Sequence, residues 1–210
     1  MFPIEFVMRA YLTGSTNTSI WTHYKNGSRN YCGFELKDGM KKNQKLENAI
    51  LTPTTKSDTH DELITIEEII RKGYMNKQDL AICEKYAYEL FNFSQKEVNK
   101  KGLILVDTKY EFGKDKDRNI LLIDEIQTPD SSRYWFLDSY ENRIKYNQEP
   151  ENVDKEFIRL WYKNNCNPYE DKNIPEPPKE LIQELTNKYI LLYEKITSNK
   201  FKFEDCNIDH

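Results

Sequence analysis

The stretch LVDTKYEFGKDKDRNILLIDEIQTPDSSRYW, from Leu105 to Trp135, combines short apolar runs with charged residues. Two runs have the continuous apolar character of buried strands: LILV, which begins at Leu103, and ILLID. They predict a hairpin with DTKYEFG as a loop. A structural hairpin needs alternation and a turn, but it does not need charges of both signs where its strands end. These charges are therefore candidates for a functional site.

The bulk composition bounds the class of protein. The chain has 210 residues, of which 38% are hydrophobic and 31% are charged, and these values fit a folded globular protein. At roughly 150 residues per domain, this length suits one large domain or a domain with an appendage. The net charge is -4, so we expect no nucleic-acid partner, and an anionic ligand must be held by a local cluster of positive groups.

Cysteine spacing and hydropathy indicate the compartment. The four cysteines (Cys32, Cys83, Cys166 and Cys206) are far apart and show no CxxC spacing, which argues against a disulfide framework or a zinc site and favours a reducing cytosol. No apolar run is long enough to span a membrane, and the N-terminus MFPIEFVMRAYL lacks the features of a signal peptide. We therefore expect a cytoplasmic protein without a membrane partner.

Hydrophobic periodicity predicts an α+β fold. The clearest helix spans residues 77–100 and ends before Gly102. Thr65 and Glu68 have capping-box spacing and open a short helix that stops at Gly73. Strands are expected at residues 4–12, 31–36 and 49–51, and further helices at 153–162 and 179–197. This order predicts a mixed sheet that contains the central hairpin and packs on the helix 77–100.

Charged residues at the ends of the two apolar runs suit phosphoryl chemistry. If the strands pair, Glu111 and Asp124 converge at one end of the hairpin. Two carboxylates from neighbouring strands suit a Mg²⁺ ion that keeps waters and binds nucleotide phosphates. Lys109 beside them can neutralise charge on a transferring phosphoryl group, as in the kinase catalytic loop and its metal-binding Asp. From spacing alone, a surface cluster of salt bridges explains these residues equally well.

Several long polar segments resemble one known family. LVDTKYEFG, together with MFPIEFVMRAYLTGS at the N-terminus, closely resembles the two signatures of the SAICAR synthetase (phosphoribosylaminoimidazole-succinocarboxamide synthase) family of purine biosynthesis. TPTTKSDTHDE, IDEIQTPDSSRYW and VDKEFIRLW match that family in order. The resemblance covers about residues 1–165 and implies the C-terminal lobe of a kinase-like, two-lobed ATP site. We expect residues 1–165 to form this catalytic and substrate lobe, and residues 166–210 to add a helix and tail packed on it.

The resemblance also implies a reaction. The family joins L-aspartate to the carboxylate of carboxyaminoimidazole ribotide with ATP as the energy source, through an acyl phosphate, and gives SAICAR. The expected ligands are therefore ATP, Mg²⁺, L-aspartate and the ribotide. Both steps need anions that are neutralised and aligned.

Residue roles are carried over position by position. Glu111 and Asp124 match the family's positions for the metal and the nucleotide, and Lys109, with Asp107 in the same motif, matches the catalytic position near the reacting carboxylate. The expected substrate-binding residues are Arg9, Ser15, Lys56, Asp61, Ser131, Ser132, Arg133, Lys155 and Arg159.

Each of these substrate assignments has a purely structural alternative. Arg9 can form a salt bridge at a strand edge, and residues 131–133 have the composition of an ordinary turn. Lys155 and Arg159 lie four residues apart and can mark a solvated helix face.

The family resemblance leaves one lobe without a counterpart in this sequence. In the family, a smaller β-rich lobe with a Gly-rich cover over ATP precedes the PIEFVMR segment, whereas here only Met1 and Phe2 precede Pro3. The sequence has seven glycines, none of them clustered. We expect the second lobe alone, with little activity by itself, and a separate chain is one candidate for its N-lobe. The alternative is a truncated, non-catalytic module that binds the ribotide.

Overall fold

The computed structural model describes residues 1–56, 62–167 and 170–203. The strands are β1 (Ile4–Tyr11), β2 (Asn30–Tyr31), β3 (Phe34–Glu35), β4 (Lys45–Leu51), β5 (Thr54–Thr55), β6 (Leu103–Lys114), β7 (Ile120–Ile123) and β8 (Ser132–Phe136). The helices are α1 (Ile20–Lys25), α2 (Ile66–Arg71), α3 (Lys77–Asn99), α4 (Leu137–Lys145), α5 (Glu156–Asn165) and α6 (Lys179–Thr197). The expected α+β class is confirmed.

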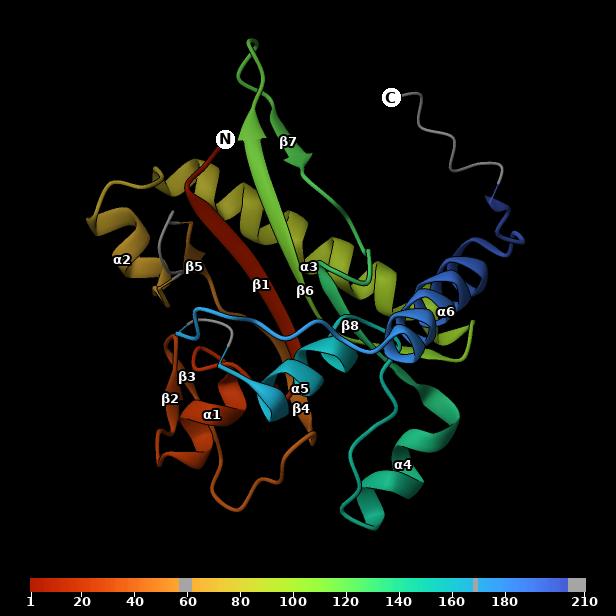
Figure 1. Cartoon of the computed structure of the whole chain (residues 1–210). Helices are drawn as coiled ribbons and strands as arrows, with labels where there is room; N and C mark the ends of the chain where they lie inside the picture. Colours follow the sequence, from red (N-terminus) through yellow and green to blue (C-terminus); the bar gives the residue numbers. More distant parts are fainter. Residues whose placement is uncertain (57–61, 168–169, 204–210) are drawn as a thin grey trace.

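The central sheet has the strand order β4-β1-β6-β7, with β5 added to β1 and β8 added to β6. Every pairing among the described strands of this sheet is antiparallel, so the prediction of a mixed sheet was wrong. Strands β7 and β8 each return to β6 after a short connection, and short connections favour antiparallel neighbours, whereas parallel neighbours need a longer crossover. Figure 1 shows β1 and β6 side by side at the centre.

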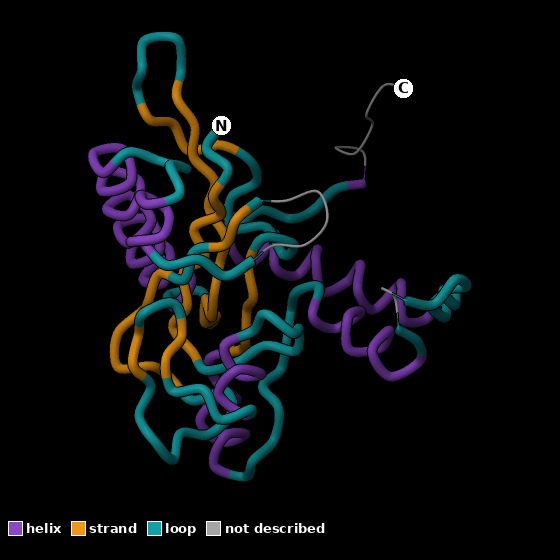
Figure 2. Tube along the Cα trace, turned by 90° about the vertical axis from the view of Figure 1, so that its left-hand side faces the viewer, coloured by secondary structure: helices purple, strands orange, loops and turns teal. Residues whose placement is uncertain are grey.

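Strand β6 is much longer than the run LILV. It continues to Lys114, so the segment DTKYEFG is strand and not the predicted loop. Its first half pairs with β8 and its last four residues pair with β7. The hairpin turn lies at residues 115–119, where Asp115 Oδ1 accepts the N–H groups of Asp117 (2.9 Å) and Asn119 (2.8 Å). Figure 2 shows this hairpin extending beyond the rest of the sheet.

Helix α3 covers one face of the sheet, as its periodicity predicts. Figure 1 shows α3 behind the strands and α5 in front of them. The α3 side chains Leu80, Cys83, Ala87 and Phe91 are buried in the main core. The helix begins after Asn76, whose side chain accepts the N–H of Asp79. The capping box predicted at α2 is also present, since the Thr65 and Glu68 side chains each accept the other residue's backbone N–H.

Three elements after the hairpin differ from the prediction. Residues 132–136 form β8, although Ser131, Ser132 and Arg133 have the composition of a turn. Helix α4 follows directly and was not predicted. Helix α5 begins at Glu156 rather than at Val153, because Asp154 Oδ1 accepts the N–H of Glu156 at 2.7 Å and fixes the first turn there. For β8, the pairing with β6 outweighs the local sequence signal.

Helix α6 begins and ends at the predicted residues. Leu192 lies in the main core with 1% of its surface exposed, and Tyr189 donates to Asp130 Oδ1 at 2.7 Å. These contacts support the prediction that residues 166–210 pack on the domain formed by residues 1–165, and the division itself stays a prediction. Among the described residues, no helix is both long and apolar enough to cross a lipid bilayer.

Candidate active site

The register of the sheet gathers charged side chains on the face opposite α3. Arg9 of β1 lies across from Asp107 of β6, and Asp107 lies across from Arg133 of β8. Nearer the hairpin, Glu5 of β1 lies across from Glu111 of β6. Side chains alternate between the two faces of a strand, so residues 107, 109 and 111 all point to this one face, while Tyr110 and Phe112 point into the core. The charged residues that follow LILV therefore lie within strand β6, and they belong to two clusters on this face of the sheet.

The first cluster is a charge row of alternating sign, made of Arg9, Asp107, Arg133, Glu156 and Arg159. Arg9 Nη1 lies 3.8 Å from Asp107 Oδ2, and Arg133 also ion-pairs with that oxygen. Arg133 Nη2 and Arg159 Nη1 lie 3.2 and 3.1 Å from Glu156 Oε2. The first four side chains are at most 13% exposed. Four of the five members of the row are therefore buried, unlike the exposed side chains of an ordinary turn or of a solvated helix face.

The pairing within the charge row shifts proton affinities. Burial lowers the pKa of Arg133, but the charges of Asp107 and Glu156 outweigh burial and raise it. Burial would raise the pKa of Glu156, yet Arg133, Ser15 and Arg159 together lower it to about 2. Glu156 and Arg133 are therefore held in their ionised forms, and the row sets three arginines against two carboxylates. That surplus of positive charge suits an anionic ligand.

The second cluster surrounds the ammonium group of Lys109. Lys109 Nζ lies 2.8 Å from Glu111 Oε1, 3.1 Å from Glu5 Oε1 and 3.5 Å from Asp124 Oδ2. Lys56 Nζ lies 2.6 Å from the other oxygen of Glu111. Glu111 is buried, whereas the side chain of Asp124 is 42% exposed. Glu111 and Asp124 thus reach the same lysine from two neighbouring strands.

Hydrogen bonds and nearby charges shift the pKa values of both lysines and of Asp124 in this cluster. Burial would lower the pKa of Lys109, but its hydrogen bonds to Glu111 and Glu5 raise it overall. The hydrogen bond to Glu111 likewise raises the pKa of Lys56. The pKa of Asp124 is lowered, first by the backbone N–H of Glu125 and further by Lys109. At neutral pH the cluster therefore presents both lysines as cations and Asp124 as an anion.

The donor set of the lysine cluster fits a Mg²⁺ ion that arrives with a nucleotide. Among the described residues, no group of three or more His, Cys, Asp or Glu side chains is arranged to hold a metal by itself. Mg²⁺ seldom uses such a site; it commonly binds one or two carboxylates, substrate phosphates and waters. Glu111 and Asp124, which converge on Lys109, supply such a pair.

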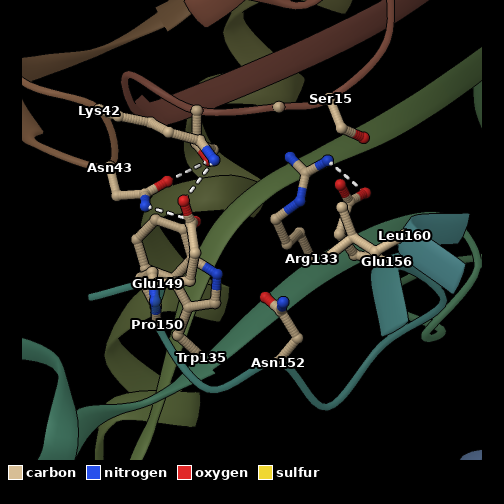
Figure 3. A pocket seen from close by; sticks show the side chains of 12 residues that line it. Ser15, Lys42, Asn43, Arg133, Trp135, Glu149, Pro150, Asn152, Glu156 and Leu160 are labelled. Atoms are coloured by element: carbon tan, nitrogen blue, oxygen red, sulfur yellow. Dashed lines mark hydrogen bonds and ion pairs between the residues drawn. The ribbon is translucent and has the colours of Figure 1, made fainter. Parts of the chain in front are cut away.

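A pocket of about 150 Å³ opens beside the charge row. In Figure 3, the Ser15 hydroxyl and the Glu156 carboxylate both lie on the same side of the Arg133 guanidinium group. The buried hydroxyl of Ser15 has no close hydrogen-bond partner among the described residues, although it lies near enough to Glu156 to lower the pKa of that carboxylate. Ser15 follows Gly14, which has a φ of +113° and leaves no room for a side chain, since an added Cβ would lie 2.3 Å from Ser19 Cβ. The Gly14 turn thus places a hydroxyl and an arginine at one pocket.

The opposite wall of the pocket was not predicted from the sequence. Lys42 Nζ and Asn43 Nδ2 donate to the two oxygens of Glu149, at 2.5 and 2.9 Å, and Asn152 and Trp135 also line the pocket. Asn43 has a φ of +64°, so an asparagine that tolerates the left-handed region occupies a tight turn there. Lys42 and Glu149 are 107 positions apart, so no local pattern could have joined them.

The structure separates the serines from Arg133. Ser132 is next to Arg133 in β8 and therefore points to the other face, where its hydroxyl lies 2.7 Å from Thr108 Oγ1 in a buried position. The Ser131 hydroxyl contacts Thr128 within the same loop. Neither residue lines the pocket with Arg133 and Ser15. The expected loop with three adjacent ligand-binding residues is therefore not what the fold forms.

The remaining predicted residues lie in different places. Arg9 reaches the charge row but does not line the pocket, and its Nε donates to Thr52 Oγ1 at 2.9 Å. Lys56 belongs to the lysine cluster. Lys155 is half-buried at the start of α5 and forms no ion pair in the described part of the chain. Its pKa is lowered mainly by burial and further by the positive charge of Arg159. Asp61 lies outside the described residues.

Comparisons with known proteins show the family of this chain. A family model described as SAICAR synthetase matches residues 1–176. The chain is 58% identical over 200 residues to the chloroplastic phosphoribosylaminoimidazole-succinocarboxamide synthase of Arabidopsis thaliana, covering 95% of this chain and 49% of that protein. It is 50% identical over 204 residues to the phosphoribosylaminoimidazole-succinocarboxamide synthase of Legionella pneumophila (strain Paris), covering 97% and 65%. A solved structure of the SAICAR synthase of Saccharomyces cerevisiae, complexed with SAICAR, superposes with a TM-score of 0.77 at 31% identity, covering 96% and 62%.

Buried cations beside a pair of carboxylates are what an enzyme of phosphorylated small molecules needs. The chain belongs to the SAICAR synthetase family. It spans about half the length of its Arabidopsis relative and 65% of the length of its Legionella relative.

Proposed function

We propose that this chain takes part in the ATP-dependent ligation of L-aspartate to carboxyaminoimidazole ribotide, which gives SAICAR. The observation that carries the proposal is the convergence of Glu111 and Asp124 on Lys109, on the same sheet face as the Arg133 pocket. Family membership supplies the reaction, since the relatives carry the name of this synthase.

The ribotide phosphate is assigned to the pocket beside the charge row. Arg133 can donate to phosphate oxygens while Asp107 and Glu156 hold its guanidinium group in place. The hydroxyl of Ser15 offers a further donor. Arg9 and Arg159 close the two ends of the row and add charge without lining the pocket. Charge-assisted hydrogen bonds of this kind are about twice as strong as neutral ones.

The phosphoryl transfer is assigned to the lysine cluster. A carboxylate is a poor electrophile, so the ribotide carboxylate first attacks the γ-phosphorus of ATP, and ADP leaves. The aspartate amine then attacks the acyl carbon and expels inorganic phosphate. In this assignment Lys109 neutralises the reacting anions, and its raised pKa keeps it charged.

Glu111 and Asp124 would hold Mg²⁺, which, when bound, screens the charge on the ATP phosphates. Asp107 is assigned a supporting role, because both of its arginine contacts lie in the charge row rather than in the lysine cluster. Lys56, through Glu111, belongs to the nucleotide end of the site, and Lys155 is a half-buried cation close to Arg159. For Asp61, Ser131 and Ser132 the proposal rests on the family resemblance alone.

The proposal is tested with the 210-residue chain in an assay that contains ATP, Mg²⁺, L-aspartate and the ribotide. The assay is run with and without the region that the longer relatives carry outside the matched segment. We expect the ribotide to bind to the chain alone, and turnover to require the added region. Asp124→Ala should then abolish turnover, and Lys37→Ala, which removes an exposed lysine of a surface ion pair, should not. Absence of ribotide binding together with absence of turnover in both arms would refute the proposal.

The names of the relatives favour the enzyme over a non-catalytic ribotide-binding module. A separate chain that supplies an N-terminal lobe stays a hypothesis, and the two arms of this assay address it. A cytoplasmic location also stays a prediction, and the Arabidopsis relative is named as chloroplastic.

A further inference from the structure

The loop that carries Asp124 connects β7 to β8 and spans residues 124–131; we refer to it as the Asp124 loop. Asp124 and Gln127 both have a positive φ, of 66° and 59°. The Asp124 carboxylate is 42% exposed, and its contact with Lys109, at 3.5 Å, is the longest of the three carboxylate contacts around that lysine. The position of this carboxylate therefore depends on what holds its loop.

Gln127 ties the Asp124 loop to the core. Its Nε2 donates to the hydroxyl of Tyr110 at 2.6 Å and to Ser94 Oγ at 3.0 Å. Its Oε1 and its backbone carbonyl accept from the hydroxyl of Tyr134, at 3.2 and 2.8 Å. These partners belong to β6, α3 and β8 respectively. One side chain therefore joins the loop to three elements of the domain.

The side chains next to Gln127 in the Asp124 loop do not join the loop to the core. Among the described contacts, Glu125 bonds only to Thr128 within the loop, and Ile126 is 46% exposed. The later half of the loop has other anchors, since the backbone carbonyl of Pro129 accepts the N–H of Lys155 and Asp130 accepts from α6. The half that begins with Asp124 is thus held at its start by β7, where Ile123 pairs with Glu111, and beyond that point by Gln127.

We propose that Gln127 is a positioning residue that sets the Asp124 carboxylate beside Glu111 and Lys109. Its closest partner, Tyr110, directly precedes Glu111 in β6, so the hydrogen bond ties Asp124 to the strand that carries the other carboxylate. Arg133 is fixed independently by Asp107 and Glu156. Gln127 should therefore affect the nucleotide end of the site and leave the ribotide pocket unchanged. This inference rests on the proposed role of Asp124.

The test compares the 210-residue chain with its Gln127→Met variant, in which the side chain keeps its length and loses its hydrogen bonds. Hydrogen exchange followed by mass spectrometry should show amides of residues 124–131 exchanging about tenfold faster, because the opening loses more than one buried hydrogen bond. Exchange in residues 77–99 should stay unchanged. Binding of ADP with Mg²⁺ should weaken severalfold, whereas the Kd for the ribotide should not change.

Two controls separate positioning from general destabilisation. Tyr24→Phe removes a buried hydroxyl in the smaller core, where it donates to the carbonyl of Lys37, and should leave exchange in the Asp124 loop unchanged. In an Asp124→Asn background, Gln127→Met should cause no further loss of Mg²⁺-ADP affinity, because a positioning residue acts through Asp124. Equal exchange in wild type and Gln127→Met, or additive losses in the double variant, overturns the inference. If wild type binds no Mg²⁺-ADP, the proposed nucleotide site fails, and the exchange result still decides whether Gln127 anchors the loop.

Discussion

Replacing Arg133 by Ala tests the charge row and the ribotide pocket together. The guanidinium group lies between Asp107 and Glu156, lines the pocket beside Ser15, and its side chain is only 12% exposed. Its removal takes away the donor that we assign to the ribotide phosphate. It also leaves two carboxylates with less compensation, although Arg9 still faces Asp107 and Arg159 still faces Glu156.

The two effects have different magnitudes. Loss of a charge-assisted contact to the phosphate costs on the order of 2 kcal/mol, which is about a 30-fold increase in Kd. Breaking a buried ion pair by removing one partner costs about 3–5 kcal/mol of stability. The remaining arginines of the row should place the stability loss at the lower end of that range. The variant should therefore remain folded at low temperature and bind the ribotide poorly.

Calorimetry of ribotide binding at 10 °C measures the first effect, and urea denaturation measures the second. Arg29→Ala is the matched control, because Arg29 pairs with the exposed Asp38 and lies outside the pocket. We expect this control to bind the ribotide like wild type and to lose less stability than Arg133→Ala, because exposed ion pairs contribute little. A folded Arg133→Ala chain with an unchanged Kd for the ribotide would contradict the assignment of the phosphate to this pocket.

Two further predictions concern stability. Gly14→Ala should lower the free energy of unfolding by about 2–4 kcal/mol through strain and overlap with Ser19, whereas Gly27→Ala, with a φ of +95° but open space around it, should show only the smaller backbone cost of about 1 kcal/mol in denaturant titrations. Because the pKa of Glu156 is lowered to about 2 from an ordinary value near 4.3, its ionised form stabilises the fold above about pH 4.3, and this contribution is lost as the pH falls toward 2. The stability difference between wild type and Glu156→Gln should therefore shrink by about 2–3 kcal/mol between pH 5 and pH 2, and a constant difference would show that Glu156 is not held ionised by the row.

Local signals predicted α2, α3 and α6 well and missed α4. The boundaries of α3 and α6 follow from hydrophobic periodicity and from capping or Pro signals within a few residues of each end. The capping box of α2 was also read correctly from Thr65 and Glu68. Each of these signals lies within one or two helical turns, and helix formation is decided largely over that distance.

Strands and their pairing were harder to predict. Alternation of Thr108, Tyr110 and Phe112 with Asp107, Lys109 and Glu111 is a strand pattern, but the charges were read as the end of a strand. Strand β8 forms because residues 132–136 pair with the start of β6, about 30 positions away. Such a pairing leaves no local mark in a sequence that resembles a turn.

The sequence alone determined the α+β class, the main helices, and, through its resemblance to a family, most residues of the candidate site. Tertiary structure alone decided which of those residues meet. The antiparallel register places Arg9, Asp107 and Arg133 in one row, and the two-residue period of a strand sends Ser132 to the opposite face. The wall formed by Lys42 and Glu149 joins positions 107 apart. Neither result is encoded within a window of neighbouring residues, because both depend on which strands and loops pack together.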